Sequence, residues 1–172
     1  MKTLGIVSDT HVGTYLNSRE VQSLLKELRR VFSDVDEIIH AGDVCDETFI
    51  NELQKIAPTR CVRGNMDHFR GKDLLKFSIG DYSIGVIHKP PKDLENFFKE
   101  KDINILIHGH THQPVIQGTT YNTLVICPGS PTHPKAPPRK RGFKDPVARP
   151  TVIKLMINEE GHLSTYLINL NS

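Results

Sequence analysis

The first half of the chain alternates short apolar runs with segments of helical periodicity, and this alternation restricts the fold more than any other feature. The apolar runs cover residues 4–7, 37–40 and 59–62, and the helical segments cover residues 19–32 and 47–56. Apolar side chains at i, i+3, i+4 and i+7 predict the first helix, with Ser18 as its N-cap, and Pro58 closes the second. The order strand–helix–strand–helix–strand predicts an α/β sheet with right-handed crossovers.

The second half predicts further strands. A hairpin is expected over residues 74–79 and 82–88 around Gly80-Asp81, followed by a helix that Pro90 and Pro91 open and that ends near Lys101. Strands are expected at 103–107, 115–117 and 123–126, and a last hairpin at 151–157 and 162–168. Residues 128–150 are rich in proline and basic residues and predict a long loop. We expect one domain over residues 1–172, a layered α/β sandwich with mixed sheets.

Bulk properties exclude several classes of partner. The 172 residues carry a formal net charge of only +2, so we expect no nucleic-acid partner. No stretch approaches the ~20 apolar residues that span a bilayer, and the first residues do not form a signal-peptide core. The three cysteines are scattered, which does not indicate a disulfide framework. We therefore expect a cytoplasmic protein without a membrane partner.

Polar side chains that could hold metal ions follow the predicted strands at the point where each strand ends. The carboxyl ends of parallel strands form the ligand-binding edge of an open α/β sheet. Carboxylate, amide and imidazole donors together suit a pair of divalent metals such as manganese, iron, zinc or nickel. Two carboxylates, four imidazoles and one amide meet this description: Asp9, His11, Asp43, Asn65, His88, His110 and His112.

Five motifs in order make the sequence similar to a known family. They are Asp9-Thr10-His11, Gly42-Asp43, Gly64-Asn65-Met66-Asp67, His88 and Gly109-His110-Thr111-His112. Together they resemble the calcineurin-like metallophosphoesterases, and in particular their small single-domain phosphodiesterase branch. The resemblance runs from residue 1 to the Pro128-Gly129-Ser130-Pro131 turn. It implies an α/β/β/α sandwich of two mixed β-sheets flanked by helices.

The resemblance also implies a ligand set and a mechanism. One metal would be held by Asp9, His11, Asp43 and His112, and the other by Asp43, Asn65, His88 and His110. A hydroxide that bridges two divalent metals would attack phosphorus in line, with manganese as the first expectation for the metal. Asp67 is expected to orient a histidine. The implied catalytic residues are Asp9, His11, Asp43, Asn65, His110 and Asp67.

Some residues depart from the family pattern or lie outside it. Met66 stands where many relatives carry a histidine that protonates the leaving group, and a thioether cannot donate a proton. His68 is a weak candidate for that role. The cluster Arg139-Lys140-Arg141 could bind a polyanion, although a solvated loop is the preferred interpretation. His40 and His108 are expected to pack or to support ligands, whereas His133 and His162 are expected to face solvent.

Three functions are compatible with these residues. The preferred one is a phosphodiesterase that acts on small phosphodiesters or nucleotide-like substrates. The alternative is a non-catalytic or weakly active scaffold, as in the retromer subunit of this fold, but a scaffold should have lost ligands. A nuclease is a third possibility, against which the near-neutral charge argues. A homodimer is compatible with the size of the chain and its hairpin edges.

Overall fold

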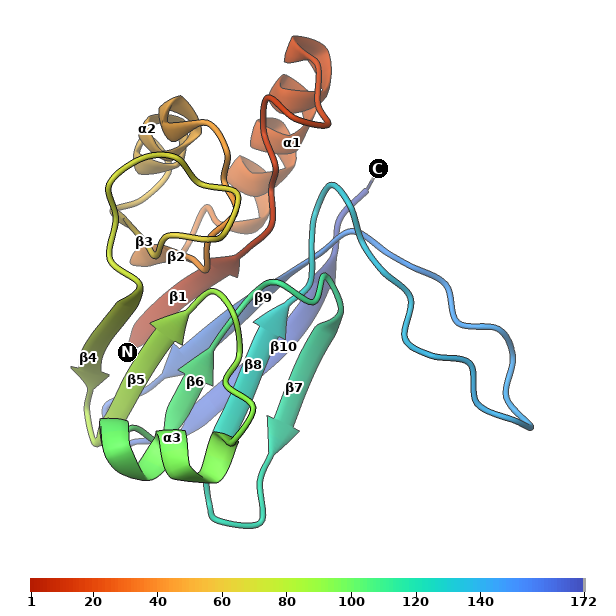
Figure 1. Cartoon of the computed structure of the whole chain (residues 1–172). Coiled ribbons are helices and arrows are strands. Elements are labelled where there is room, and N and C mark those ends of the chain that lie inside the picture. The colour runs from red at the N-terminus through yellow and green to blue at the C-terminus, as the bar shows by residue number, and fades with distance from the viewer. Residues whose placement is uncertain (172) are drawn as a thin grey trace.

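The computed structural model describes residues 1–171 and contains two five-stranded mixed sheets (Figure 1). In the first sheet β1 pairs with β2 and β2 with β3 in parallel, while β9 and β10 add antiparallel strands. Its order is β10 (Leu163–Asn169), β9 (Thr151–Ile157), β1 (Lys2–Val7), β2 (Glu37–His40), β3 (Thr59–Cys61). In the second sheet β5, β6 and β8 are parallel, with β4 and β7 antiparallel at the edges. Its order is β4 (Leu74–Ile79), β5 (Tyr82–Ile87), β6 (Ile105–Ile107), β8 (Leu124–Pro128), β7 (Pro114–Gly118).

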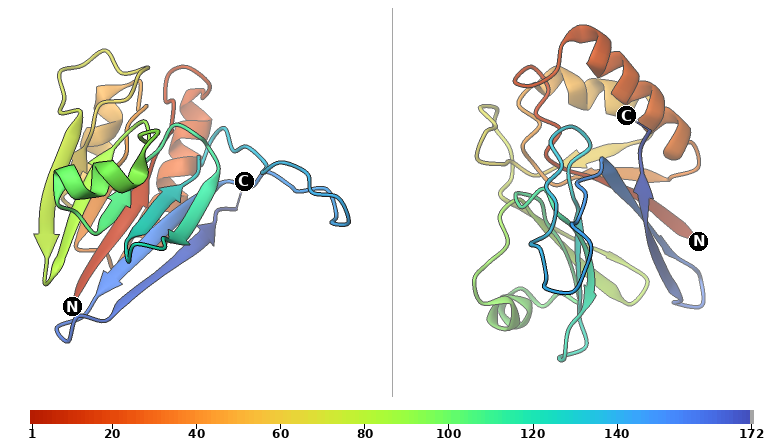
Figure 2. Two further views of the ribbon diagram at one scale, coloured as in Figure 1. Left: turned by 60° about the horizontal axis from the view of Figure 1, so that its bottom comes forward. Right: turned by 90° about the vertical axis from the view of Figure 1, so that its right-hand side faces the viewer.

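Three apolar clusters define four layers and confirm the predicted α/β/β/α sandwich (Figure 2). Side chains alternate along each strand, so Leu4 and Ile6 of β1 point into the cluster between the two sheets while Val7 points the other way. Helices α1 (Ser18–Val31) and α2 (Glu47–Gln54) cover the outer face of the first sheet. Helix α3 (Leu94–Lys101) covers the outer face of the second sheet, where Phe98 packs in the same apolar cluster as Leu106 of β6.

Two helix starts differ from the prediction. Asn17, and not Ser18, caps α1: its Oδ1 accepts hydrogen bonds from Arg19 N at 3.0 Å and Glu20 N at 3.1 Å. The Glu20 carboxylate accepts a hydrogen bond from Asn17 N in return, which completes a capping box. Asn and Ser cap equally well, so residue type could not choose between two neighbours. Helix α3 begins at Leu94 after the N-cap Asp93, beyond the predicted Pro90-Pro91 start.

The strand predicted over 103–107 begins only at Ile105. Asp102 ends α3 in the left-handed region with φ +50°, and the chain has to turn before it can join the sheet. Ile103 packs in the cluster beneath α3, and a Cβ on Gly85 would lie 2.6 Å from its Cδ1. The strands at 37–40, 74–79 and 151–157 match the prediction, and the remaining element boundaries differ from the predicted ones by at most two residues.

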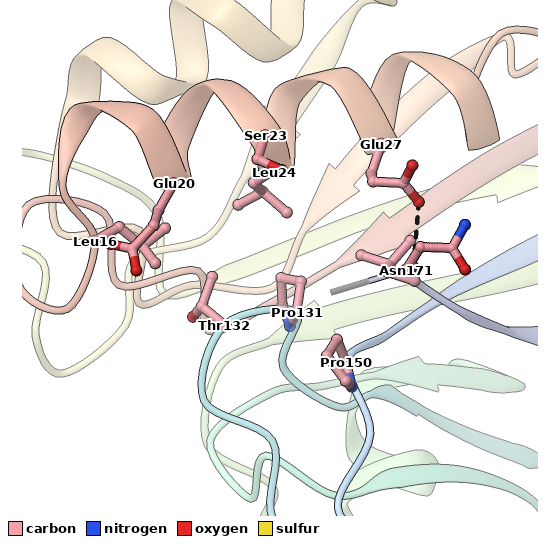
Figure 3. Close-up of a pocket in the computed structure, with 10 residues that line it drawn as sticks. Leu16, Glu20, Ser23, Leu24, Glu27, Pro131, Thr132, Pro150 and Asn171 are labelled. Carbon is pink, nitrogen blue, oxygen red and sulfur yellow. Dashed lines mark hydrogen bonds between the residues drawn. The ribbon is translucent and has the colours of Figure 1, made fainter.

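Residues 131–150 contain no helix or strand and form a loop that projects from the sandwich, visible in blue at the right of Figure 1. We call these residues the basic arm. Its two ends lie together beside α1, where Pro131 and Pro150 line a groove of about 260 Å³ with Glu20 and Glu27 (Figure 3). Among residues 1–171, no helix is long and apolar enough to cross a membrane.

Candidate metal centre

The loops that follow five strands meet at one edge of the sandwich. Backbone hydrogen bonds join them: Asp9 N donates to Gly42 O at 3.0 Å, and Gly109 N donates to His88 O at 2.9 Å. The structure brings together all seven side chains that the sequence singled out as candidate ligands. They follow β1 (Asp9, His11), β2 (Asp43), β3 (Asn65), β5 (His88) and β6 (His110, His112).

Asp9, His11 and His112 form the first group of donors. All three are buried, and the two imidazole Nε2 atoms lie 3.2 Å apart. Asp9 Oδ1 lies 3.4 Å from His112 Nε2 and 3.9 Å from His11 Nε2. One ligand atom from each of the three residues therefore falls within 4.8 Å of the other two, which is close enough for a single ion.

Asp43, Asn65, His88 and His110 form the second group. Asp43 Oδ2 lies 3.2 Å from His88 Nε2. Asn65 Oδ1 lies 3.0 Å from both His88 Nε2 and His110 Nδ1. Asp9, Asp43 and His88 also offer ligand atoms within 4.8 Å of one another, so the carboxylate of Asp9 belongs to both compact triads. Asp43 Oδ2 is 4.0 Å from His11 Nε2, a placement between the two groups.

The hydrogen-bond chemistry of the histidines fits a metal. His88 Nδ1 lies 2.8 Å from the carbonyl of Ala41, which only accepts, so this nitrogen carries the proton. In neutral His88 the lone pair of Nε2 then faces the carboxylate of Asp43 and the amide oxygen of Asn65. His112 Nδ1 donates to the carbonyl of His133 at 2.7 Å in the same way, which leaves its Nε2 lone pair facing His11. Lone pairs that converge without a proton between them are the arrangement that a cation stabilises.

The backbone at these ligands is strained. Among residues 1–171, eight non-glycine residues have a positive φ, and five of them are candidate ligands: Asp9, His11, Asp43, His110 and His112. Their φ angles lie between 44° and 72°, in the left-handed region that side chains with a Cβ rarely adopt. Such strain costs about 1 kcal/mol or more per residue and concentrates at functional sites. The loops thus keep a costly conformation that aims these side chains at one point.

Burial and charge move the pKa values of the ligands in different directions. Burial raises the pKa of Asp9. Burial also acts on Asp43, but the hydrogen bonds from His88 and from Met66 N outweigh it and hold the pKa of Asp43 below its usual range. Burial lowers the pKa of His11 and of His110, which favours the neutral form that binds metals. Burial lowers the pKa of His88, but the contacts with the Asp43 carboxylate and the Ala41 carbonyl, together with the charges of Asp43 and Asp9, outweigh burial and raise that pKa.

Comparison with known proteins identifies the family. The sequence model of the calcineurin-like phosphoesterase superfamily domain matches residues 1–143. Over 143 residues the chain is 40% identical to the "Probable metallophosphoesterase MJ0623" of Methanocaldococcus jannaschii, a match that covers 78% of this chain and 70% of that protein. The chain belongs to the calcineurin-like phosphoesterase superfamily. This confirms the family that the five motifs resemble.

Solved structures agree on the fold of this metallophosphoesterase. Vacuolar Protein Sorting 29 from Cryptosporidium parvum superposes with a TM-score of 0.72 at 17% identity, covering 98% of each chain. A protein described as a novel archaeal phosphodiesterase superposes with a TM-score of 0.68 at 23% identity, covering 96% of this chain and 99% of that one. At these identities the likeness shows the fold alone.

Asp67 has a different role from the expected one. It was predicted to orient a histidine, but it makes no hydrogen bond to one among the residues that the structure describes. Its buried carboxylate instead accepts four backbone N–H groups, from Asp43 at 2.9 Å, Val44 at 2.8 Å, Cys45 at 2.8 Å and Gly64 at 2.7 Å. Asp67 thus fastens the loop after β2 to the loop after β3 and positions Asp43 through the backbone.

Several supporting residues of the metallophosphoesterase centre were not predicted. The hydroxyl of Ser8 donates to Asp9 Oδ2 at 2.7 Å, and the hydroxyl of Ser130 donates to Asp9 O at 2.7 Å. Thr132 Oγ1 donates to Thr10 O at 3.0 Å. Of these, only Ser130 lay in a segment named in the sequence comparison, the turn at which the family resemblance ends. Hydroxyl residues such as Ser8 and Thr132 are common after strands and in loops, so their types carried no signal.

Four of the five remaining histidines, all but the exposed His68, divide between buried and exposed positions as expected, with one addition. His40 is fully buried, lies 3.1 Å from the hydroxyl of Thr10, and its pKa is lowered by burial to about 3, so it supports the centre as a neutral side chain. His108 is buried too, and His162 is exposed. The side chain of His133 is exposed as predicted, but its carbonyl is the acceptor that orients His112.

A cleft of about 520 Å³ adjoins the second group of ligands. Asn65 and His88 form the wall that it shares with the candidate metal centre. Exposed cationic side chains surround it, and the apolar side chains of Leu74 and Phe97 form part of its floor. The cations are Arg63, Lys89 and Lys101. The carboxylate of Asp73, which pairs with Arg63 at 2.8 Å, also lines the cleft.

Proposed function

We propose that this metallophosphoesterase is a phosphodiesterase that uses two divalent metal ions to hydrolyse small phosphodiesters or nucleotide-like substrates. One observation carries the proposal: the seven side chains converge as two groups of donors at one edge of the sandwich, beside a cleft whose lining includes three cations and one carboxylate. We assign Asp9, His11, Asp43 and His112 to one ion, and Asp43, Asn65, His88 and His110 to the other.

Different residues of the site would have different roles in this reaction. Divalent ions at such a centre supply an activated water and offset the charge of the phosphate. Asp9 and Asp43 balance the charge of the ions, and the carbonyl of Ala41 keeps Nε2 of His88 free for coordination. Lys89, which follows His88 and faces the cleft, is placed to contact a phosphate oxygen.

The cleft and Met66 favour one class of leaving group. Met66 is 39% exposed beside Asn65, and its thioether cannot protonate a departing alkoxide. Aryl alcohols and nucleotide phosphates depart without such help. Phe97 and Leu74 give an aromatic leaving group apolar surface to contact. We therefore expect aryl and nucleotide-like diesters to be better substrates than simple alkyl ones.

The competing proposal is a scaffold of the same fold, and the likeness to Vacuolar Protein Sorting 29 gives it its support. A scaffold does not need a complete ligand set or a backbone held in strained conformations at the ligands. This chain keeps all seven candidate ligands, and the backbone is strained at five of them. We therefore prefer the enzyme, and place the scaffold second.

The test begins with metal removal by a chelator. Manganese, iron, zinc and nickel are then added back one at a time, and hydrolysis of an aryl phosphodiester is compared with hydrolysis of the matching monoester. Calorimetric titration of each ion provides a readout that does not depend on activity. We expect two ions per chain, with activity restored by manganese or a neighbouring metal and greater on the diester.

Asp43→Asn is the decisive variant. It should lower activity by more than the about 10- to 100-fold typical of residues that only orient a ligand. Asp81→Asn, in the exposed turn between β4 and β5, is the matched control and should leave activity unchanged. Ion binding without hydrolysis of any ester would shift the assignment to the scaffold.

A further inference from the structure

The charge of the chain is distributed very unevenly. The basic arm carries one acidic residue, Asp145, against six exposed basic ones. Because the whole chain has a net charge of +2 and the arm +5, the rest of the chain is at −3. The small net charge, from which no nucleic-acid partner was expected, is therefore the sum of an acidic body and a strongly basic projection. The six basic residues are Lys135, Arg139, Lys140, Arg141, Lys144 and Arg149.

The arm has a defined shape. Six prolines restrict its backbone, and at its tip Phe143 N donates to Lys140 O at 3.2 Å across a turn in which Gly142 has φ +87°. Arg139 Nε and Asp145 Oδ1 form an ion pair at 2.8 Å that joins its outgoing and returning halves. Figure 1 and the left view in Figure 2 show the arm projecting away from the sandwich. An arm restricted in this way loses less conformational entropy on binding than a flexible one.

The arm begins at the metal centre. His133 O accepts the hydrogen bond from His112 Nδ1 at 2.7 Å, and Lys135 N donates to His112 O at 3.1 Å. Gln113 Nε2 donates to Ala136 O at 3.1 Å. The first residues of the arm therefore lie against the rim of the centre, and its cations continue outward from there.

Aromatic rings stand at both ends of the arm. At its base the ring of His133 stacks on that of Tyr15, with centroids 4.9 Å apart and an interplanar angle of 11°. Tyr15 is 52% exposed, and its ring also packs edge-to-face with that of the candidate ligand His11, with centroids 5.3 Å apart. At its tip Phe143 is 74% exposed, next to Lys144. Exposed rings among cations are the combination that binds unpaired bases and their phosphates together.

We propose that the basic arm binds single-stranded nucleic acid. The backbone phosphates contact the arm's cations, and unpaired bases stack on Phe143 and on the Tyr15–His133 pair, so the strand leads toward the metal centre. An anionic lipid surface is a poorer fit, since Phe143 and Val147 are the only large apolar side chains that the arm exposes. The proposal goes beyond the proposed function, because it requires binding and not hydrolysis.

The test measures binding to a fluorescein-labelled oligonucleotide of roughly 16 nucleotides, within the span of known single-strand sites. Anisotropy is followed in EDTA, so that hydrolysis cannot contribute. The variant Arg139→Ala/Lys140→Ala/Arg141→Ala removes three cations from the arm. Its control, Lys55→Ala/Lys76→Ala/Lys99→Ala, removes three exposed cations from the body. All six side chains are exposed, so we expect both variants to fold.

For the wild type and the control we expect binding that weakens with salt. The arm variant should have a slope of log K against log salt that is shallower by about 2, because each lost phosphate contact contributes about 0.7. Phe143→Ala should weaken binding at least about 5-fold by loss of one stacked base. Hydrolysis of a small aryl diester should be the same in all these proteins.

Three results would overturn the proposal: no binding at low salt, equal binding by the arm variant and the control, or arm-dependent binding to anionic vesicles without binding to the oligonucleotide. Failure of the proposed function is recognised separately. Absence of ester hydrolysis beside arm-dependent binding would leave the arm proposal standing and remove the phosphodiesterase.

Discussion

Three buried carboxylates with different neighbours support the metal centre at the scale of single residues. Asp9 and Asp43 carry oxygens that face imidazole nitrogens, whereas every hydrogen bond of Asp67 comes from a backbone N–H. A carboxylate is purely an acceptor, so it can receive four N–H groups, two on each oxygen. The carboxylate of Asp67 therefore stabilises the backbone of the loops and is not a candidate metal ligand.

Replacement of Asp67 by Asn should destabilise the protein. The amide keeps one oxygen but turns an NH₂ group toward donors that then lack an acceptor. The loss of hydrogen bonds to a charged acceptor and the burial of unpaired N–H groups should lower the free energy of unfolding by about 2 kcal/mol or more. Urea denaturation of metal-free protein measures this difference.

Asp73→Asn is the control for that measurement. The Asp73 side chain is 76% exposed and its ion pair with Arg63, at 2.8 Å, is of the surface kind that contributes little. Equal unfolding free energies for the two variants would show that the four backbone contacts of Asp67 do not hold the loops together.

At the scale of elements, the close approach of loops decides the geometry of the centre. Gly64 and Gly109 lie where the loops after β3 and β6 contact the loops after β2 and β1. A Cβ on Gly109 would fall 2.0 Å from Ser8 Oγ, 2.7 Å from Asp9 Oδ2 and 2.9 Å from Ala41 O. The same glycine precedes His110, whose backbone N–H donates to Asp9 Oδ2 at 3.0 Å. Because Gly109 has no side chain, the loop after β6, which carries His110, can approach the loop after β1, which carries Asp9, this closely.

Gly109→Ala should separate these loops. The added methyl group must displace Ser8 and Asp9, so we expect a loss of about 1–3 kcal/mol of stability and weaker metal binding. Gly118→Ala is a matched control, because no atom lies within 4 Å of its Cβ position. Denaturant unfolding and metal titration of both variants test the argument. Indistinguishable variants would mean that the loops adjust without cost.

At the scale of the whole molecule, the chain order of strands and ligands was predictable and the supporting contacts were not. The alternation of apolar runs placed Asp9, Asp43 and Asn65 on strand ends, which is a local property of the sequence. The hydrogen bond from Ser130 to Asp9 O joins residues 121 positions apart, and no local pattern reports such a contact. The N-cap at Asn17 also escaped prediction, since its neighbour Ser18 caps helices equally well.

Metal binding should stabilise the entire fold, because its ligands come from loops after both sheets. An ion that binds only the folded state at 100 times its Kd adds about 2.7 kcal/mol to the free energy of unfolding. His110→Ala should lose most of this increment. In EDTA, the unfolding temperature of His110→Ala should be close to that of the wild type, because His110 is only half-buried. His162→Ala, on the exposed terminal hairpin, should keep the full increment. Thermal unfolding with and without manganese provides the comparison, and an undiminished increment in His110→Ala would remove this residue from the ligand set.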